Sequence, residues 1–123
     1  MNHKSFKKWL DALGRAWTMR DPKAAANLYC EDVLYYETPF SPPLKSKKEI
    51  ERIWEDVPRS QKDIHFSYDI LTVNNDLGIA HWKASFMKLP SNKKVELDGI
   101  FVIKLDNDGL CKEFRQWWVV KSS

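Results

Sequence analysis

The sequence is poor in the residues that usually build metal, phosphate or disulfide sites. It has two cysteines, three histidines and four glycines among 123 residues. Cys30 and Cys111 lack CxxC spacing, and His3, His65 and His81 lack metal-ligand spacing, so we expect reduced thiols and no metal site. Four scattered glycines cannot form a Gly-rich phosphate loop. We therefore expect no cofactor.

Excess charge of one sign and long apolar runs are also missing. The chain has 20 basic and 17 acidic residues, a net charge of +3. Its basic residues are spread out, whereas binding to a phosphate backbone needs a clustered basic stripe. The charged N-terminal stretch has no signal-peptide core, and no apolar run is long enough to span a membrane. We expect a cytoplasmic protein that binds neither nucleic acid nor membranes.

What the chain does contain is apolar and aromatic. Hydrophobic residues make up 43% of the chain, which contains six tryptophans. This composition argues against disorder. The length suits one domain with a real hydrophobic core, so we expect a single domain over residues 1–123.

The first third of the chain predicts helices. A stripe at three- and four-residue steps predicts a helix of about four turns with Ser5 as its N-cap. The stripe comprises Phe6, Trp9, Leu10, Leu13, Ala16 and Trp17. Asp21 followed by Pro22 predicts a second, short helix that runs to about Tyr29.

Residues 32–40, DVLYYETPF, predict a short strand that ends in a proline-rich loop. Ser46 with Glu49 three residues later is a capping box, which predicts a third helix that ends at Pro58. After that the apolar period changes to two, which predicts four strands. They cover Ile64–Val73, Leu77–Lys88, Lys94–Leu105 and Cys111–Val120.

Short turns separate these four strands, so they should form an antiparallel meander. The predicted fold class is therefore α+β, with three helices packed on one face of a curved antiparallel sheet. Alternation puts His81, Arg115 and Trp117 on the wetter face of that sheet. A large exposed apolar residue often marks an interface, so this outer face could join two subunits. Alternatively, Trp117 is a lone surface tryptophan packed under Arg115.

Three stretches together resemble the cone-shaped superfamily around nuclear transport factor 2. They are AWTMRDPKAAANLYCEDVLYYETP, SKKEIERIW and DGIFVIKLDNDG followed by FRQWW. The SnoaL-like proteins and the ketosteroid isomerases are similar in spacing over nearly the whole chain. The resemblance implies a cystatin-like α+β barrel with an internal, mostly apolar pocket, and a fold that hosts both enzymes and binders.

Residues 20–50 align with the isomerase pattern without a gap, and the catalytic base of that family falls at Glu37. The enolate-binding donors of the isomerase do not carry over, because Leu13 and Phe101 occupy their positions. Trp54 replaces a supporting tyrosine. Since one such donor contributes roughly 3–4 kcal/mol, steroid isomerisation is not expected. Glu37 remains a candidate general base if the pocket desolvates it; otherwise it faces solvent or pairs with a lysine.

The resemblance also implies a set of pocket walls. We expect them to be formed by Leu13, Trp17, Tyr35, Trp54, Trp82, Phe101, Phe114 and Trp118. The hydroxyl of Tyr35, on the same side of its strand as Glu37, would donate to a ligand or to a buried backbone group. SnoaL-like cyclases use an acid on a late strand, but alternation places Asp98 on the outer face. The acid–base set of the superfamily's epoxide hydrolases is not carried over, because Arg115 points outward.

Two classes of function stay open. The first is a SnoaL-like protein, dimeric, that binds a small apolar or aromatic molecule. If it is an enzyme, we expect a cofactor-free isomerase, cyclase or dehydratase step with Glu37 as base. The second is a non-catalytic binding or interaction module that acts through His81, Arg115 and Trp117. An open cavity with Glu37 on its wall would favour the first.

Overall fold

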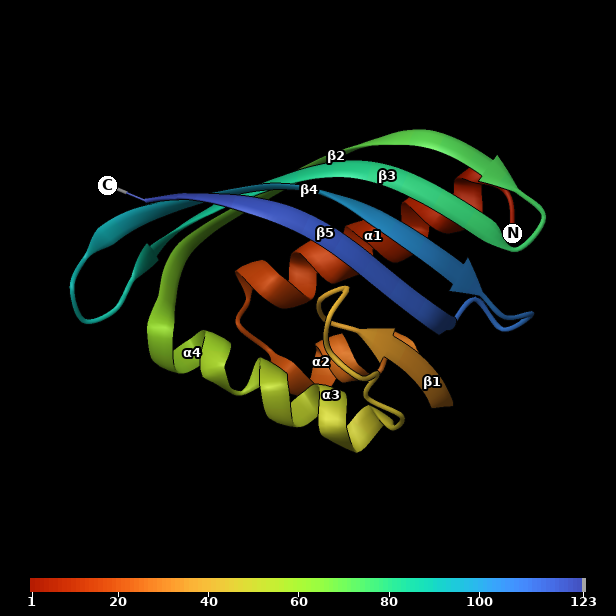
Figure 1. Cartoon of the computed structure of the whole chain (residues 1–123), viewed down its shortest axis with the longest axis horizontal. Helices are drawn as coiled ribbons and strands as arrows, with labels where there is room; N and C mark the ends of the chain where they lie inside the picture. The colour runs from red at the N-terminus through yellow and green to blue at the C-terminus, as the bar shows by residue number, and fades with distance from the viewer. Residues whose placement is uncertain (123) are drawn as a thin grey trace.

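The computed structural model describes residues 1–122 (Figure 1). Its first helix, α1 (His3–Thr18), starts earlier than predicted, because Asn2 and not Ser5 is the N-cap. The Ser5 N–H donates to the Asn2 side chain at 2.8 Å, and the Asn2 N–H donates to the Ser5 hydroxyl at 3.0 Å. These reciprocal bonds satisfy donors at the helix start. The predicted apolar stripe of α1 is buried.

The second helix, α2 (Pro22–Ala26), is shorter than predicted, because Tyr29 belongs to the first strand. Asp21 caps α2 by accepting a hydrogen bond from the Ala24 N–H at 3.1 Å. The strand β1 (Tyr29–Tyr36) pairs with the last strand of the sheet, where Tyr29 lies opposite Cys111. This pairing occupies backbone N–H and C=O groups that a longer α2 helix would have to use in its own hydrogen bonds.

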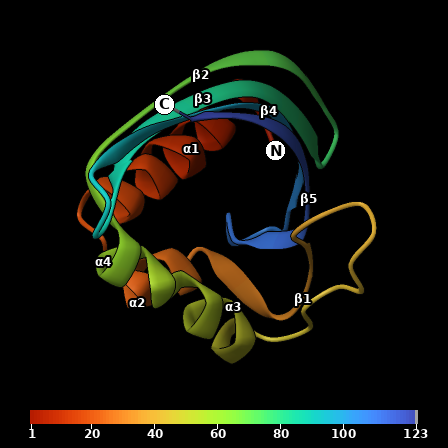
Figure 2. The ribbon, with the colours of Figure 1, turned by 60° about the vertical axis from the view of Figure 1, so that its left-hand side comes forward.

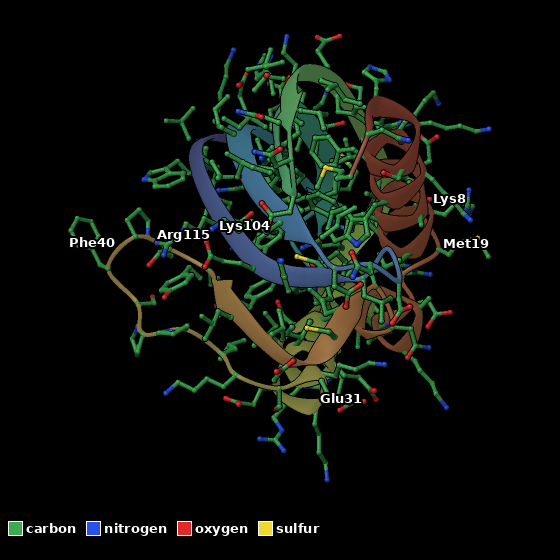
Figure 3. All side chains as sticks on the ribbon, turned by 90° about the vertical axis from the view of Figure 1, so that its right-hand side faces the viewer. Lys8, Met19, Glu31, Phe40, Lys104 and Arg115 are labelled. Atoms are coloured by element: carbon green, nitrogen blue, oxygen red, sulfur yellow. The ribbon has the colours of Figure 1, made fainter. Side chains whose placement is uncertain are left out.

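A loop follows β1 and leads into the third helix. Two backbone hydrogen bonds between Tyr35 and Leu44, at 2.9 and 2.8 Å, close its base. Its outer end is a turn in which the Ser41 N–H donates to the Thr38 carbonyl at 3.3 Å. Figure 3 shows Phe40 at this turn, pointing away from the rest of the molecule.

The predicted third helix is divided in two, α3 (Lys47–Trp54) and α4 (Asp56–Ser60). The capping box is confirmed: the Glu49 N–H donates to the Ser46 hydroxyl at 3.2 Å, and that hydroxyl donates to the Glu49 carboxylate at 3.2 Å. Pro58 was predicted to end the helix, but it lies inside α4. It is tolerated there because the first turn of a helix leaves its N–H groups unbonded in any case.

The meander of four antiparallel strands is confirmed. It consists of β2 (Gln61–Asn74), β3 (Leu77–Lys88), β4 (Lys93–Leu105) and β5 (Cys111–Ser122). The strand order in the sheet is β1-β5-β4-β3-β2, and β1 joins β5 in parallel. A parallel pair needs a long connection, and here α3, α4 and three strands supply it.

The helices lie on the concave side of the curved sheet, as the α+β prediction required. In Figure 2 the strands β2, β3, β4 and β5 curve around α1, while α2, α3, α4 and the edge strand β1 lie opposite α1. Buried side chains of α1, β1, β3, β4 and β5 meet in one hydrophobic core. No helix within residues 1–122 is both long and apolar enough to cross a membrane.

Gly99 allows one close approach inside this core. A Cβ atom at that position would lie 2.9 Å from Cε2 of the Trp82 ring and would collide with the Trp117 carbonyl oxygen. Because such distances are shorter than real Cβ contacts, a side chain at position 99 would force shifts of Trp82, which lies opposite on β3, and of the Trp117 backbone.

Candidate ligand-binding site

A cavity of about 230 Å³ lies under the concave face of the sheet. All eight residues predicted as pocket walls line it, and Glu37 lies on its wall as well. The remaining lining residues are Tyr29, Ile53, Asp56, Val57, Gln61, Leu97 and Gln116. The cavity is therefore built by residues from both helices and strands, far apart in the sequence.

Stacked aromatic rings form much of the cavity wall. The Trp82 and Phe101 rings stack with centroids 4.8 Å apart, and the Tyr35 and Phe114 rings stack at 4.5 Å. Phe101 and Phe114 are 5.2 Å apart and join the two stacks. Rings at these spacings attract one another, so the wall is both apolar and firmly held in shape.

Polar side chains gather on another part of the lining. Glu37 comes directly after β1. Its side chain is exposed, whereas desolvation of the carboxylate would require it to be enclosed. Its backbone carbonyl accepts a hydrogen bond from Gln116 Nε2 at 3.1 Å. Gln61 accepts one from Trp17 Nε1 at 2.8 Å. With the exposed Asp56, these are polar residues in a lining that is otherwise largely apolar and aromatic.

Two hydrogen-bond donors in the cavity wall have no protein partner. They are the Tyr29 hydroxyl and Trp82 Nε1, both buried and without a partner among residues 1–122. Burial raises the pKa of the Tyr29 phenol well above its usual value, so the hydroxyl keeps its proton. An indole N–H can only donate. Buried donors are nearly always satisfied, so these two unsatisfied donors of cavity-lining residues need an explanation.

Tyr35 is a second buried phenol in the wall. Burial raises its pKa, and the nearby Glu37 charge adds to the effect. The Tyr35 hydroxyl is therefore neutral at physiological pH and able to donate to a ligand. Glu37 thus lies beside an aromatic wall that carries neutral donors.

Sequence reasoning missed some of these residues. Tyr29 was assigned to the end of a helix, and its alternation with Val33 and Tyr35 along β1 was the signal for a strand. Gln116 could have been found, because it lies between Phe114 and Trp118 on the same face of β5. The positions that carry donors in the isomerase, Leu13 and Phe101, line the cavity as apolar residues.

The outer face of the sheet holds the other singled-out residues. Asp98 points outward, as alternation predicted, and its carboxylate oxygen lies 2.7 Å from His81 Nε2. The Arg115 guanidinium lies 3.9 Å from the centroid of the Tyr36 ring. Trp117 is 46% exposed and Val119 is 70% exposed. None of these side chains belongs to the cavity lining described above.

Helices packed inside a curved sheet around an aromatic cavity define a cone-shaped α+β protein of the nuclear transport factor 2-like class. The sequence model of the SnoaL-like domain matches residues 7–114, so the chain belongs to that family. No curated protein matches the chain.

Solved structures share the fold at low sequence identity. A computationally designed 17-OHP binder has a TM-score of 0.80 and 15% identity, covering 95% of this chain and 96% of its own. The epoxide hydrolase/cyclase-like enzyme SalBIII of salinomycin pyran-ring formation has a TM-score of 0.84 and 10% identity, with coverages of 99% and 98%. A Mycobacterium Δ5-3-ketosteroid isomerase has a TM-score of 0.79 and 11% identity, with coverages of 97% and 98%.

Proposed function

We propose that this protein binds a small apolar or aromatic molecule in the cavity and catalyses a cofactor-free proton transfer with Glu37 as general base. The supporting observation is the aromatic cavity of about 230 Å³ with a carboxylate on its wall. Pockets for small ligands are mostly apolar with a few convergent polar groups. The solved structures of similar fold include a binder, a cyclase-like enzyme and an isomerase, and this range fits either binding or proton transfer.

In the proposed reaction Glu37 removes a proton from a carbon next to a carbonyl group of the ligand. The C–H electron pair forms a carbon–carbon double bond, and the carbonyl electrons move to oxygen. If the ligand carries a β,γ double bond, the enolate is conjugated with it, and return of the proton to the γ carbon moves the double bond, re-forms the carbonyl group and completes an isomerisation. The exposed position of Glu37 lets it exchange protons with solvent, and its neighbour Tyr35 supplies a neutral donor.

Exchange of α-protons for deuterium tests this step without knowledge of the natural substrate. We suggest hexanophenone in D2O, followed by NMR, with the wild type and Glu37→Gln. A general base contributes about 10²–10⁴-fold, so the variant should exchange at least about 100-fold more slowly. Glu31→Gln is the matched control, since Glu31 is an exposed acid on β1 outside the cavity lining. Equal rates for wild type and Glu37→Gln would remove Glu37 as the base.

A second proposal concerns the outer sheet face, where Trp117 and Val119 are exposed on β5. Such residues suit contact with a second copy of this chain, which makes the protein a homodimer. Sedimentation of the wild type should show a dimer, and Trp117→Ala should shift it toward monomer. A monomeric wild type would refute this proposal and leave the cavity proposal intact.

A wild type that binds hexanophenone without exchanging its protons would instead indicate a non-catalytic binder.

A further inference from the structure

A second, larger space adjoins the cavity beside α4. It is a groove of about 670 Å³ between α4 and the hairpin that joins β3 to β4 (Figure 1). Asp56, Gln61 and Leu97 belong to the linings of both spaces. The cavity of about 230 Å³ is smaller than usual small-molecule pockets of about 300–1,000 Å³. A ligand longer than the cavity therefore continues past these three residues into the groove.

The hairpin side of the groove is held in place by backbone hydrogen bonds. The Leu89 N–H donates to the Ser60 carbonyl at the end of α4, at 2.8 Å. The Asn92 N–H donates to the Lys88 carbonyl at 2.7 Å and closes the turn. The groove is therefore a formed part of the fold, with α4 and the hairpin tied together at one end of it.

The sheet side of the groove is apolar. Phe86 and Val95 belong to the hydrophobic core, and Leu97 packs against it. Val120, on the last strand, also lines the groove and is 58% exposed. Such a surface suits the hydrocarbon part of a ligand.

Two lysines lie at the hairpin end of this apolar surface and belong to the groove lining. Lys88 is the last residue of β3, Lys93 is the first of β4, and the two are directly opposite each other in the antiparallel pair. Alternation puts Lys88 on the same face as Phe86, and Lys93 on the same face as Val95. Opposite residues have Cβ atoms about 4.5–5.5 Å apart, so both ammonium groups can reach one anion.

The charges of the two lysines are not balanced by a neighbouring acid. Like charges directly opposite on adjacent strands destabilise a sheet. No carboxylate of residues 1–122 forms an ion pair with either ammonium group. The acids of the two linings are instead Asp56, at the junction, and Glu37, on the cavity wall. An anionic group is therefore favoured at the lysines and disfavoured in the cavity.

From this arrangement we propose that the groove binds the carboxylate end of an elongated, mostly apolar ligand. The carboxylate lies between Lys88 and Lys93, the hydrocarbon chain follows the apolar side of the groove, and the apolar or aromatic end fills the cavity beside Glu37. This inference rests on the proposed function and specifies its ligand class, a monoanionic acid with a long apolar body.

Titration calorimetry at low salt tests the carboxylate with a series of phenyl ketones. Each acid, from 6-oxo-6-phenylhexanoic acid to 12-oxo-12-phenyldodecanoic acid, is compared with its methyl ester, and hexanophenone serves as the probe of the cavity alone. An exposed ion pair is worth up to about fivefold in affinity, so two should favour the best-fitting acid over its ester by about tenfold. This ratio should fall toward one in 1 M NaCl, because salt screens exposed charges.

Substitutions locate the carboxylate. Lys88→Gln and Lys93→Gln should each remove most of the advantage of the acid and leave the affinity of the ester unchanged. Lys94→Gln is the matched control, since Lys94 follows Lys93 on β4 but points to the other face and is outside the groove lining. Lys93→Gln and Lys94→Gln remove the same charge at neighbouring positions, so a difference between them reports contact in the groove.

The outcomes separate this inference from the function on which it rests. Equal affinities of acid and ester at every chain length would overturn the carboxylate site, while binding of hexanophenone would still support the cavity. Equal losses from Lys93→Gln and Lys94→Gln would overturn it as well, because the acid would then respond only to the net charge of the protein. Binding of none of these ketones would contradict both the inference and the proposed function.

Discussion

Replacing Tyr29 by phenylalanine should stabilise the ligand-free protein, although Tyr29 is completely buried. The substitution removes only the hydroxyl, and the edge-on ring contacts with Trp9, Tyr35 and Phe114, at 5.7, 5.5 and 6.0 Å between centroids, are kept. An unsatisfied buried polar group costs about 1–3 kcal/mol, so the free energy of unfolding should rise by about that amount. At about 2.1 cal/mol/K of unfolding entropy per residue, this corresponds to a melting temperature about 4–12 °C higher.

Thermal unfolding followed by circular dichroism measures this effect, and Tyr68→Phe provides the opposite case. The Tyr68 hydroxyl donates to the Asp11 carboxylate at 2.6 Å, so its removal should lower the melting temperature. A lower melting temperature for Tyr29→Phe as well would refute the reasoning, since it would show that the Tyr29 hydroxyl has a stabilising partner. A rise for Tyr29→Phe together with a fall for Tyr68→Phe would support a donor kept at a cost in stability.

Two further substitutions test other parts of the fold. Gly99→Ala should lower the free energy of unfolding by about 1–3 kcal/mol, because the added methyl group meets the Trp82 ring. Urea denaturation measures this change. An unchanged midpoint would contradict the contact. Hydrogen bonds from Lys7 and Tyr68 hold the pKa of Asp11 below its usual value, so folding favours its ionised form. The resulting stabilisation is full above the unfolded pKa and is lost as pH falls through the lower folded pKa. Asp11→Ala should therefore be less stable than wild type at pH 7, with a gap that closes in acid; a gap independent of pH would contradict this.

The fold could be predicted from local signals that agree with one another. The period-two alternation from residue 64 onward and the short polar turns specified the meander, and the observed bounds of β3 match the prediction. The capping box at Ser46 marked a helix start that the structure confirms. Helix ends were harder to predict, because Tyr29 joins β1 only through pairing with Cys111, more than eighty residues away. The local sign of this strand was the apolar alternation of Tyr29 with Val33 and Tyr35.

The walls of the cavity were predictable from the family resemblance, but its chemistry was not. The eight expected wall residues line one cavity, and Glu37 is on its wall. What the sequence could not reveal is which polar groups go without a partner there. That depends on how Tyr29 and Trp82 are enclosed by side chains from several elements. For Glu37 the sequence left a desolvated and a solvent-facing carboxylate open, and in the structure its side chain is exposed just past the end of β1.

The proposal that the cavity binds a ligand is tested most directly by the indole N–H resonances of the six tryptophans. A ¹H–¹⁵N spectrum of the wild type titrated with hexanophenone reads them one by one, after assignment with single Trp→Phe variants. The indole resonances of the cavity residues Trp17, Trp54, Trp82 and Trp118 should shift. Trp117 on the outer face should stay in place. Shifts confined to Trp117, or none at all at a saturating concentration, would contradict the account.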